Sequence, residues 1–220
     1  MINKRNIFGI NVDDYSLKES MLKVDNFLNN TVLNTIHIIN FDSLMDATEN
    51  KVMKKCIEGL DLSIIGDEDI LSFIGIESES RHNEISDNVF INEFLEKVEK
   101  SGATVYLVGS TNEVIESFAN VLDKKYPDIN CIGRQIYEKD STDPASVVNE
   151  INSCMPDIII SLLKSPAQEE FILENKDMLS SKLWLGLGCL VFKTNQNNSF
   201  VKKLKRFFYK TIIKWRIYNI

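Results

Sequence analysis

Two polar residues, Asn40 and Asp67, each follow an apolar run of strand character and precede a segment with the pattern of a helix. Residues 38–39 lead into Asn40, and residues 62–66 lead into Asp67. In an open α/β sheet, ligands bind at the carboxyl ends of the strands, where helix amino ends direct their N–H groups inward. A carboxylate there can take up a proton, and an amide can hold a polar ligand. The spacing therefore predicts that Asn40 and Asp67 face one ligand.

The same residues have a structural interpretation that requires no ligand. An Asp after a strand is a common N-cap of the next helix, and an Asn at such a place often satisfies the backbone of a turn. His37, inside the apolar run before Asn40, has the surroundings of a core imidazole rather than of a metal ligand. Because His82 is the only other histidine, a metal site built from several histidines is excluded.

The elements that position these residues alternate along the chain. Capping boxes at residues 16–19 and 110–113 indicate helix starts, and the polar, aperiodic segment 77–88 is expected to be a loop over a site. We expect strands at residues 7–12, 35–39, 62–65, 104–109, 130–132, 157–163 and 183–187, and helices at residues 16–29, 41–56, 69–74, 89–100, 114–126, 144–153 and 167–175. This alternation predicts an α/β fold with a mainly parallel sheet covered by helices on both faces.

The composition is that of a globular protein with a sizeable core. The 220 residues are 44% hydrophobic and 26% charged. No stretch approaches the roughly 20 apolar residues that cross a bilayer, and no apolar segment follows the first five residues, so we expect a cytoplasmic protein without a secretory signal. The cysteines at positions 56, 131, 154 and 189 lack the paired spacing of zinc ligands and are expected to be buried, reduced thiols.

Charge is divided unevenly along the chain. Residues 193–220 hold eight of the 25 Lys and Arg residues and none of the 32 acidic residues, so the preceding part has a net charge of −15. An acidic body argues against a broad nucleic-acid surface, because phosphate contacts require a basic face. The basic tail requires a separate explanation.

The tail has the pattern of a basic amphipathic helix. Its apolar residues recur at spacings of three and four, and include Phe208 and Trp215. Such a helix suits contact with an anionic membrane, where each cation contributes about 1 kcal/mol and apolar side chains add burial. The alternative is a helix packed on its own domain or on a second subunit of a homo-oligomer. The cations expected at the membrane are Lys202, Lys203, Lys205, Arg206, Lys210, Lys214 and Arg216.

A set of short motifs, taken in order, resembles one family of bacterial enzymes. The motifs lie at residues 7–13, 38–40, 64–67, 105–109, 126–127, 166–169, 174–175 and 186–188. In this combination the chain resembles the WecG/TagA/CpsF family of glycosyltransferases over nearly its whole length. The resemblance implies a Rossmann-like domain over residues 1–192, with halves at about 1–88 and 89–192, and a membrane-contact appendage over residues 193–220.

The resemblance implies an inverting transfer of a sugar from a UDP-sugar to a lipid carrier at the inner face of the cell membrane. In the teichoic acid branch the donor is UDP-N-acetylmannosamine and the acceptor is undecaprenyl-diphosphate-linked N-acetylglucosamine. Other branches use UDP-N-acetylmannosaminuronic acid or build capsular and exopolysaccharide units. The family pattern matches Asp67 to the general base, and it places Asn40 and Gln168 in the active-site pocket. It implies no metal requirement, so we expect no metal ion or other cofactor.

General chemistry supports these roles. An inverting transfer needs a base for the proton of the attacking hydroxyl, and a partly shielded carboxylate can have its pKa raised toward the working range. The charge of departing UDP, in the absence of a metal, must be met by backbone N–H groups, amides or cations. Besides Asn40 and Gln168, the turns at Gly109 and Gly188 are candidates for this contact.

Two motifs also have other interpretations. Gln168 follows Pro166 closely enough to serve only as a cap of the next helix. Residues 67–69 match the Asp-x-Asp motif with which other glycosyltransferases hold a metal ion, although a motif of three residues is weak evidence. No Gly-x-Gly-x-x-Gly or Walker pattern follows any strand, which disfavours an unrelated nucleotide-binding protein.

Several positions depart from the family pattern. Ile38 stands where Thr is usual, and residues 66–68 read Gly-Asp-Glu in place of Pro-Asp-Gly. The loop that usually presents an Arg before a Gly-x-Asp motif has Glu84 at the aligned place, with Arg81 nearby as the candidate substrate contact. The Gly-Ala-Phe-Asp and Arg-Ala-Pro blocks expected after Gly188 are not recognisable. The alternative function is therefore a degenerate family member that binds a nucleotide sugar or a partner transferase without catalysing transfer.

Overall fold

The computed structural model describes residues 4–188 of the chain. The predicted basic helix within residues 193–220, its membrane-contact residues and Cys189 lie outside the described residues. None of the helices within residues 4–188 is long and apolar enough to span a lipid bilayer.

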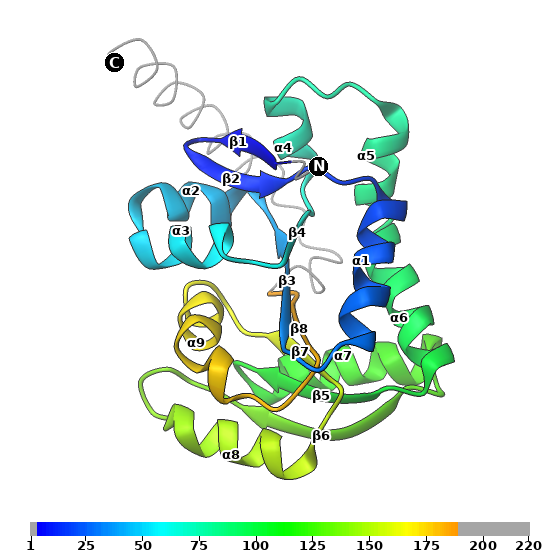
Figure 1. Ribbon diagram of the computed structural model, residues 1–220, viewed down its shortest axis with the longest axis vertical. Coiled ribbons are helices and arrows are strands. Elements are labelled where there is room, and N and C mark those ends of the chain that lie inside the picture. Colours follow the sequence, from blue (N-terminus) through cyan, green and yellow to red (C-terminus); the bar gives the residue numbers. More distant parts are fainter. Residues whose placement is uncertain (1–3, 189–220) are drawn as a thin grey trace.

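Within residues 4–188, six strands form one parallel sheet in the order β4-β3-β8-β7-β5-β6 (Figure 1). The strands are β3 (Asn34–Ile39), β4 (Leu62–Ile65), β5 (Thr104–Gly109), β6 (Asn130–Ile136), β7 (Ile158–Leu162) and β8 (Leu183–Gly186). The last of them along the chain, β8, is inserted between β3 and β7, so it joins the pair β4-β3 to the trio β7-β5-β6. The predicted α/β class with a parallel, Rossmann-like sheet is confirmed.

Helices cover both faces of this sheet (Figure 1). Their apolar residues fall into two clusters, one on each side, because side chains of a strand alternate between the faces. The first cluster includes α2 (Phe41–Glu49), α3 (Lys51–Glu58), α8 (Pro144–Cys154) and α9 (Ala167–Asn175), which is followed by a short 3-10 turn (Lys176–Met178). The second includes α1 (Leu17–Asn29), α6 (Val89–Ser101) and α7 (Asn112–Lys125).

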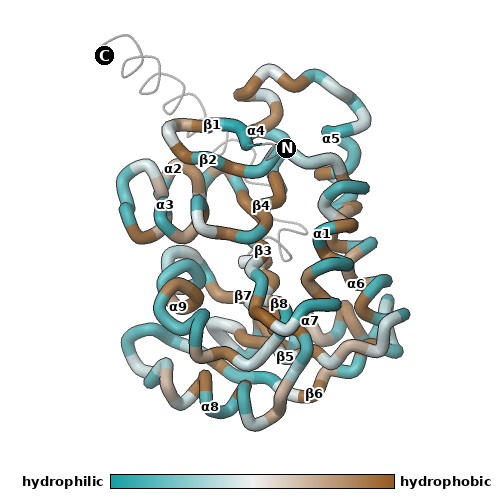
Figure 2. Tube along the Cα trace, viewed as in Figure 1, coloured by the Kyte–Doolittle hydropathy of each residue, from teal (hydrophilic) through white to brown (hydrophobic). Residues whose placement is uncertain are grey.

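The central strands form because their sequences are buried on both faces. Every residue of β3, β7 and β8 is buried, and these strands are rich in Ile and Leu. Figure 2 shows the apolar residues gathered along the strands and the inner sides of the helices. Parallel strands covered by helices on both faces carry near-continuous apolar runs, so the polar residues at their ends stand out. Those ends carry the candidate site.

The amino-terminal segment forms a hairpin that the sequence pattern did not predict. We expected one strand over residues 7–12, but β1 (Lys4–Ile7) and β2 (Ile10–Asp13) pair antiparallel. Phe8 and Gly9 adopt left-handed backbone conformations, with φ of 53° and 79°, which reverse the chain in a two-residue turn. The prediction was wrong because Phe at a left-handed turn position is uncommon.

In two of the predicted helices, at residues 41–56 and 114–126, the observed boundaries differ from the prediction by more than one residue. The expected helix over residues 41–56 is interrupted at Asn50, which ends α2 and caps α3 by accepting hydrogen bonds from the N–H groups of Val52 and Met53. The expected capping box at residues 110–113 is also wrong. Thr111 is the N-cap of α7, and its Oγ1 accepts from Val114 N.

The segment 77–88, expected to be a loop, contains the helix α5 (Glu79–Ser86). This prediction was wrong because α5 buries none of its residues fully, so no apolar periodicity marks it. The short helix α4 (Glu68–Phe73) precedes it near the carboxyl edge of the sheet (Figure 1). Among the cysteines, Cys56 is buried as expected, whereas Cys131 is exposed and Cys154 is half-buried.

Candidate active site

Asn40 and Asp67 occupy equivalent places after the neighbouring strands β3 and β4. Asn40 is the N-cap of α2, and its Oδ1 accepts a hydrogen bond from Ser43 N at 2.8 Å. Asp67 is the N-cap of α4, and its Oδ1 accepts from Asp69 N at 3.0 Å. Both residues therefore have the capping role that we considered as an alternative, and both lie at the carboxyl edge of the sheet.

The carboxylate of Asp67 also joins the two loops. Its Oδ2 accepts a hydrogen bond from Phe41 N, the residue after Asn40, at 3.3 Å. Asp67 is half-buried, so solvent or a ligand can still reach it. Because a carboxylate has about four acceptor positions and two are used by these N–H groups, the group is oriented and keeps lone pairs for a further proton. A general base must be held in a fixed orientation and must keep a lone pair free to accept the proton.

Gln168 lies on the neighbouring part of the same edge. It is 3% exposed, and its Oε1 accepts a hydrogen bond from Gly188 N at 3.1 Å, which ties the start of α9 to the segment after β8. Gly188 has a left-handed φ of 59° that favours glycine. The backbone N–H of Gly188 is therefore already paired with Gln168, and the side chain of Gln168 does not cap its own helix, contrary to the alternative interpretation.

Gly186 makes this arrangement sterically possible. A Cβ atom built at Gly186 would lie 2.5 Å from Cδ2 of His37 and 2.8 Å from Nε2 of Gln168. β3 and β8 place His37 and Gly186 at the same level of the sheet. The absent side chain of Gly186 thus leaves the space into which the imidazole and the amide fit.

His37 is a core residue, as the sequence indicated. It is 1% exposed, and its Nε2 accepts a hydrogen bond from Nε1 of Trp184 at 3.1 Å. Burial lowers the pKa of His37 to about 3, so the imidazole is neutral at physiological pH. Since Nε2 is the acceptor, Nδ1 carries the proton, and it has no hydrogen-bond partner among residues 4–188.

A buried carboxyl group beside Gln168 was not singled out by the sequence analysis. Glu169 is 3% exposed, its Oε1 accepts a hydrogen bond from Ser165 Oγ at 2.9 Å, and burial raises its pKa. Its Oε2 has no partner within the described part of the chain. Glu169 belongs to the motif at residues 166–169, so the signal was present, but its burial on the helix could not be read from the pattern.

Gly109 is placed away from this group. It ends β5, which is separated from β8 by β7. A Cβ atom at Gly109 would lie 2.5 Å from Cγ1 of Ile115, so the close packing of α7 requires glycine here. The structure therefore gives Gly109 a packing role and does not bring it next to Asp67.

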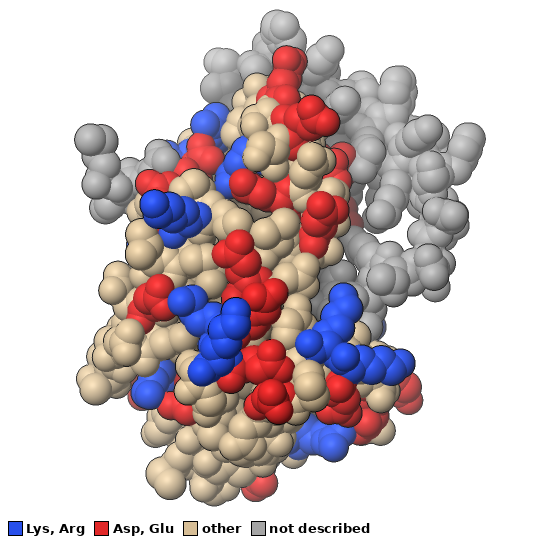
Figure 3. Space-filling model, turned by 90° about the vertical axis from the view of Figure 1, so that its right-hand side faces the viewer, with Lys and Arg blue, Asp and Glu red and all other residues tan. Residues whose placement is uncertain are grey.

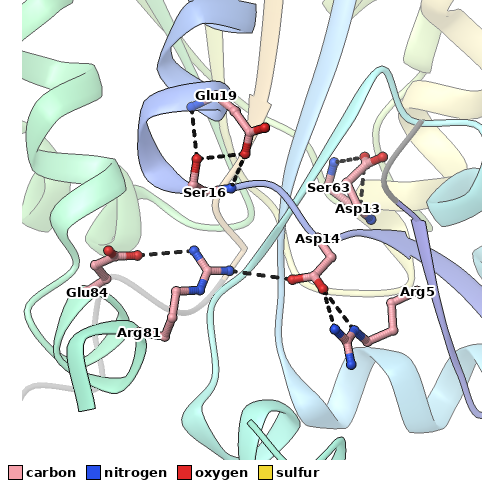
Figure 4. Close-up of polar contacts among 8 residues, drawn as sticks. All are labelled: Arg5, Asp13, Asp14, Ser16, Glu19, Ser63, Arg81 and Glu84. Atoms are coloured by element: carbon pink, nitrogen blue, oxygen red, sulfur yellow. Dashed lines mark hydrogen bonds and ion pairs between the residues drawn. The ribbon is translucent and has the colours of Figure 1, made fainter. Parts of the chain in front are cut away.

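Arg81, on α5, is held by two carboxylates (Figure 4). Its Nη1 donates to Glu84 at 3.1 Å, and its Nη2 lies 3.8 Å from the carboxylate of Asp14. Asp14 in turn accepts two hydrogen bonds from Arg5, at 2.9 and 2.6 Å. The four residues form a chain of alternating charges from the hairpin to α5.

A small cavity lies under this chain of charges. Its walls come from the ends of β2, β3 and β4 and from α1, α5 and the start of α6, and its volume is about 50 Å³. Asp13 and Ser63, which join β2 to β4 through a 2.8 Å hydrogen bond from Ser63 N, line one side (Figure 4). Arg81 and Glu84 line another, and Gly66 borders it next to Asp67. Arg81 therefore shares this cavity with Gly66, whereas Asn40 and Asp67 are not among the described residues that line it.

No obvious metal centre accompanies these groups. Within residues 4–188, no group of three or more His, Cys, Asp or Glu side chains is placed to hold a metal ion. In the acidic run 67–69, the carboxylate of Asp67 accepts hydrogen bonds from Asp69 N and Phe41 N. The expectation of a metal-independent site stays a prediction.

The molecular face formed by α1 and α6 carries charges of both signs (Figure 3). Lys97 pairs with Asp25 at 2.6 Å, and Lys100 pairs with Glu96 at 3.3 Å. Basic and acidic side chains are intermixed there rather than gathered into a basic patch. This face lacks the electrostatic character of a nucleic-acid surface.

Comparison with known proteins identifies relatives of the chain. Residues 5–194 match the profile of the glycosyl transferase WecG/TagA/CpsF family. The chain is 22% identical to an N-acetylglucosaminyldiphosphoundecaprenol N-acetyl-beta-D-mannosaminyltransferase of Staphylococcus aureus strain NCTC 8325 / PS 47, over 97% of this chain and 86% of that protein. The protein of the same name from strain MRSA252 is 23% identical over the same shares.

Proposed function

Because the chain belongs to the WecG/TagA/CpsF family of glycosyltransferases, we propose that it transfers N-acetylmannosamine from its UDP derivative to N-acetylglucosamine on undecaprenyl diphosphate. The names of the relatives from Staphylococcus aureus state the transferred sugar and this acceptor, and the chain aligns with 86% of their length. The structural observation that carries the proposal is the oriented, half-buried carboxylate of Asp67 at the carboxyl edge of the parallel sheet.

In the proposed reaction, Asp67 is the general base. A hydroxyl oxygen of the acceptor sugar attacks the anomeric carbon of the donor, the bond from that carbon to the UDP oxygen breaks, and the hydroxyl proton passes to the Asp67 carboxylate. Attack from the side opposite to UDP inverts the anomeric configuration. The N–H groups of Phe41 and Asp69 hold the carboxylate in place while it accepts the proton. Such a base contributes about 10²–10⁴-fold to the rate.

The departing UDP carries a negative charge that the edge of the sheet can meet. The amino end of α2 begins at Asn40, and helix amino ends favour anions, while the N–H groups of Phe41 and Ser43 there are already paired with Asp67 and Asn40. The amide of Gln168 lies over Gly186 and next to the chain at Gly188. We assign Asn40 and Gln168 to the donor diphosphate, with Arg81 as a cation that can reach it once released from its carboxylates. No metal ion or other cofactor is required in this scheme.

Contact with the membrane is assigned to residues 193–220. The acceptor is lipid-linked, so the protein works as a peripheral protein at the cytoplasmic face of the membrane. The eight cations of this segment offset the acidic body, which by itself is repelled by anionic lipid. This assignment is supported by the sequence pattern, because the segment lies outside the described residues.

One observation favours the alternative of a degenerate binding protein. Arg81 is paired with Asp14 and Glu84 rather than presented to the cavity as a free cation. In addition, the carboxylate of Glu84 lines the same cavity, where it repels a diphosphate. A protein with these features can bind a nucleotide sugar or a partner transferase and turn over slowly or not at all.

A transfer assay separates the two functions. The full chain is incubated with vesicles containing undecaprenyl-diphosphate-linked N-acetylglucosamine and with radiolabelled UDP-N-acetylmannosamine, UDP-N-acetylglucosamine or UDP-N-acetylmannosaminuronic acid. The proposed function predicts label in the lipid fraction with UDP-N-acetylmannosamine, and an inverted anomeric centre in the product by NMR. Binding of UDP without transfer from any donor would establish the degenerate alternative.

A further inference from the structure

Helix α5 is attached to the rest of the fold with few buried apolar side chains. None of its residues is fully buried, and its N-cap, Ser78, makes no capping hydrogen bond. Its one apolar side chain, Ile85, packs partly buried against the first apolar cluster. Its polar contacts to other elements include the ion pair of Arg81 with Asp14 and the 3.5 Å approach of His82 to Glu68, and its backbone also lies against α4 and α6. Segments held in this way open at low cost.

Both ends of the segment that contains α5 have hinge-like backbone. Gly75, which precedes it, has a left-handed φ of 73°, and no atom lies within 4 Å of the place where a Cβ would be. Asn88, which follows it, has a φ of 53°. The 3.0 Å contact of His82 Nε2 with Ile76 O lies between these two residues, so it can travel with the helix. Turning of residues 76–88 as one unit about Gly75 and Asn88 breaks the 2.9 Å hydrogen bond from Ile76 N to Leu71 O and lifts Ile76 and Ile85 from the first apolar cluster.

The cavity behind α5 is too small for a nucleotide sugar. Its volume is about 50 Å³, which suits a few water molecules, because one water needs roughly 10–15 Å³ by this type of measure. Pockets for small organic ligands are several times larger. The walls formed by β3, β4 and α1 belong to the packed core, whereas the wall formed by Arg81, Glu84 and Ile85 is the loosely attached helix. A nucleotide sugar can enter beside Gly66 only if the cavity widens, and α5 is the wall that would be displaced.

We propose that residues 76–88 form a lid over this cavity, that the ion pair between Arg81 and Asp14 is its latch, and that a nucleotide-diphosphate ligand enters when the latch opens. The latch is weak for a geometric reason. Asp14 already accepts two short hydrogen bonds from Arg5, and Arg81 approaches it only to 3.8 Å. Opening frees Nη2 of Arg81 from Asp14 for the phosphates, while Nη1 keeps its contact with Glu84 on the same helix. The nature of the ligand rests on the proposed function, whereas the motion of the lid does not.

Hydrogen exchange measured by mass spectrometry on the full, ligand-free chain tests the lid. Amides of residues 79–86 should exchange at least about tenfold faster than the core-facing amides of α6, because a local opening exposes only the former. Asp14→Asn removes the latch and should accelerate exchange of the lid about fivefold, the change expected when one partly exposed ion pair is lost. Peptides from α6 should be unaffected.

Arg5→Gln is the matched control variant. It removes the guanidinium that competes for Asp14, so Asp14 pairs more closely with Arg81 and exchange of the lid should slow. A general loss of stability moves both variants in the same direction. Acceleration in both variants, or exchange of α5 and α6 at one common rate, would overturn the lid.

A second arm uses 1 mM UDP as the probe. Bound UDP should slow exchange of residues 76–88 in the wild-type chain, because phosphates held by Arg81 then fix the displaced lid in place of the latch. Absence of any effect of UDP would count against the donor assigned above. The existence of the lid would then be decided by the hydrogen exchange of the Asp14→Asn and Arg5→Gln variants, which is measured without ligand.

Discussion

The carboxylate of Asp67 accepts a hydrogen bond from the backbone N–H of Phe41 at 3.3 Å, across 26 residues of sequence. Through this bond the loop after β4 fixes the loop after β3, so the residue proposed as base also shapes the turn that carries Asn40. Substitutions of Asp67 therefore act on both structure and chemistry. The effect on stability and the effect on sugar transfer can be measured separately.

Asp67→Asn and Asp67→Ala distinguish the base from the cap. Asn keeps an oxygen that accepts from Asp69 N, whereas Ala loses the cap at a cost of about 1 kcal/mol. If Asp67 is the base, both variants lose sugar transfer by about 10²–10⁴-fold, while urea unfolding shows a loss of stability mainly in Asp67→Ala. Wild-type transfer rates in Asp67→Asn would remove the base role.

Gly186→Ala should destabilise the protein by about 1–3 kcal/mol, because the new methyl group collides with His37 and Gln168 in a packed core. Gly102→Ala is the matched control. Gly102 has a left-handed φ of 66° and no atom near the missing Cβ, so this variant reports backbone strain alone, about 1 kcal/mol. Urea titrations measure both. Equal losses of unfolding free energy in the two variants would show that a side chain at position 186 does not collide with His37 and Gln168.

The buried imidazole of His37 should make stability depend on pH. Burial lowers its pKa from 6.5 to about 3 in the folded protein, so between these values the unfolded chain binds a proton that the folded chain does not. Stability is then full above pH 6.5 and is lost as the pH falls toward 3. His37→Gln keeps an acceptor for the indole of Trp184 and removes the titration.

Between pH 7 and pH 5, the free energy of unfolding should fall by about 2 kcal/mol more in the wild type than in His37→Gln. Urea unfolding at both values measures the difference, and the same comparison between pH 7 and pH 8 serves as the control, where the two proteins should change alike. Parallel pH profiles at acid pH would contradict the neutral, buried state of His37.

Truncation after Asn198 should abolish sedimentation with anionic vesicles. It removes seven of the eight cations of the tail together with Phe208 and Trp215, and each cation near the surface contributes about 1 kcal/mol. The full chain should sediment with vesicles rich in phosphatidylglycerol, and less so at high salt. A variant with Phe208 and Trp215 both changed to Ser tests the apolar part. Continued sedimentation of the truncated chain would reject membrane contact by this segment.

The sequence predicted most of the fold because its central strands and helices have clear periodicity. The helix over residues 167–175 was predicted with its observed bounds, and α8 was predicted to within one residue. Predictions failed where the sequence lacks an apolar periodicity and where an apolar run contains a turn. The turn at Phe8 lies inside an apolar run, and α5 has too few apolar residues to mark it as a helix.

Only the part of the site that follows from the order of the strands could be predicted from the sequence. Neighbouring parallel strands bring Asn40 and Asp67 to one edge, and the sheet order brings Gln168 to Gly188. The pairing of Arg81 with Asp14 joins residues that no periodic pattern connects. The steric need for Gly186 depends on side chains from two other elements, which become neighbours only in the folded chain.

The insertion of β8 between β3 and β7 has a consequence for biosynthesis. A ribosome releases residues 183–186 only after the other five strands of the sheet have emerged, and until then β3 and β7 each present an unpaired edge. Nascent fragments that stop short of β8 consist of two half-sheets without a shared strand, and exposed edges of this kind recruit foreign strands. Productive maturation of the polypeptide therefore depends on how quickly β8 is delivered.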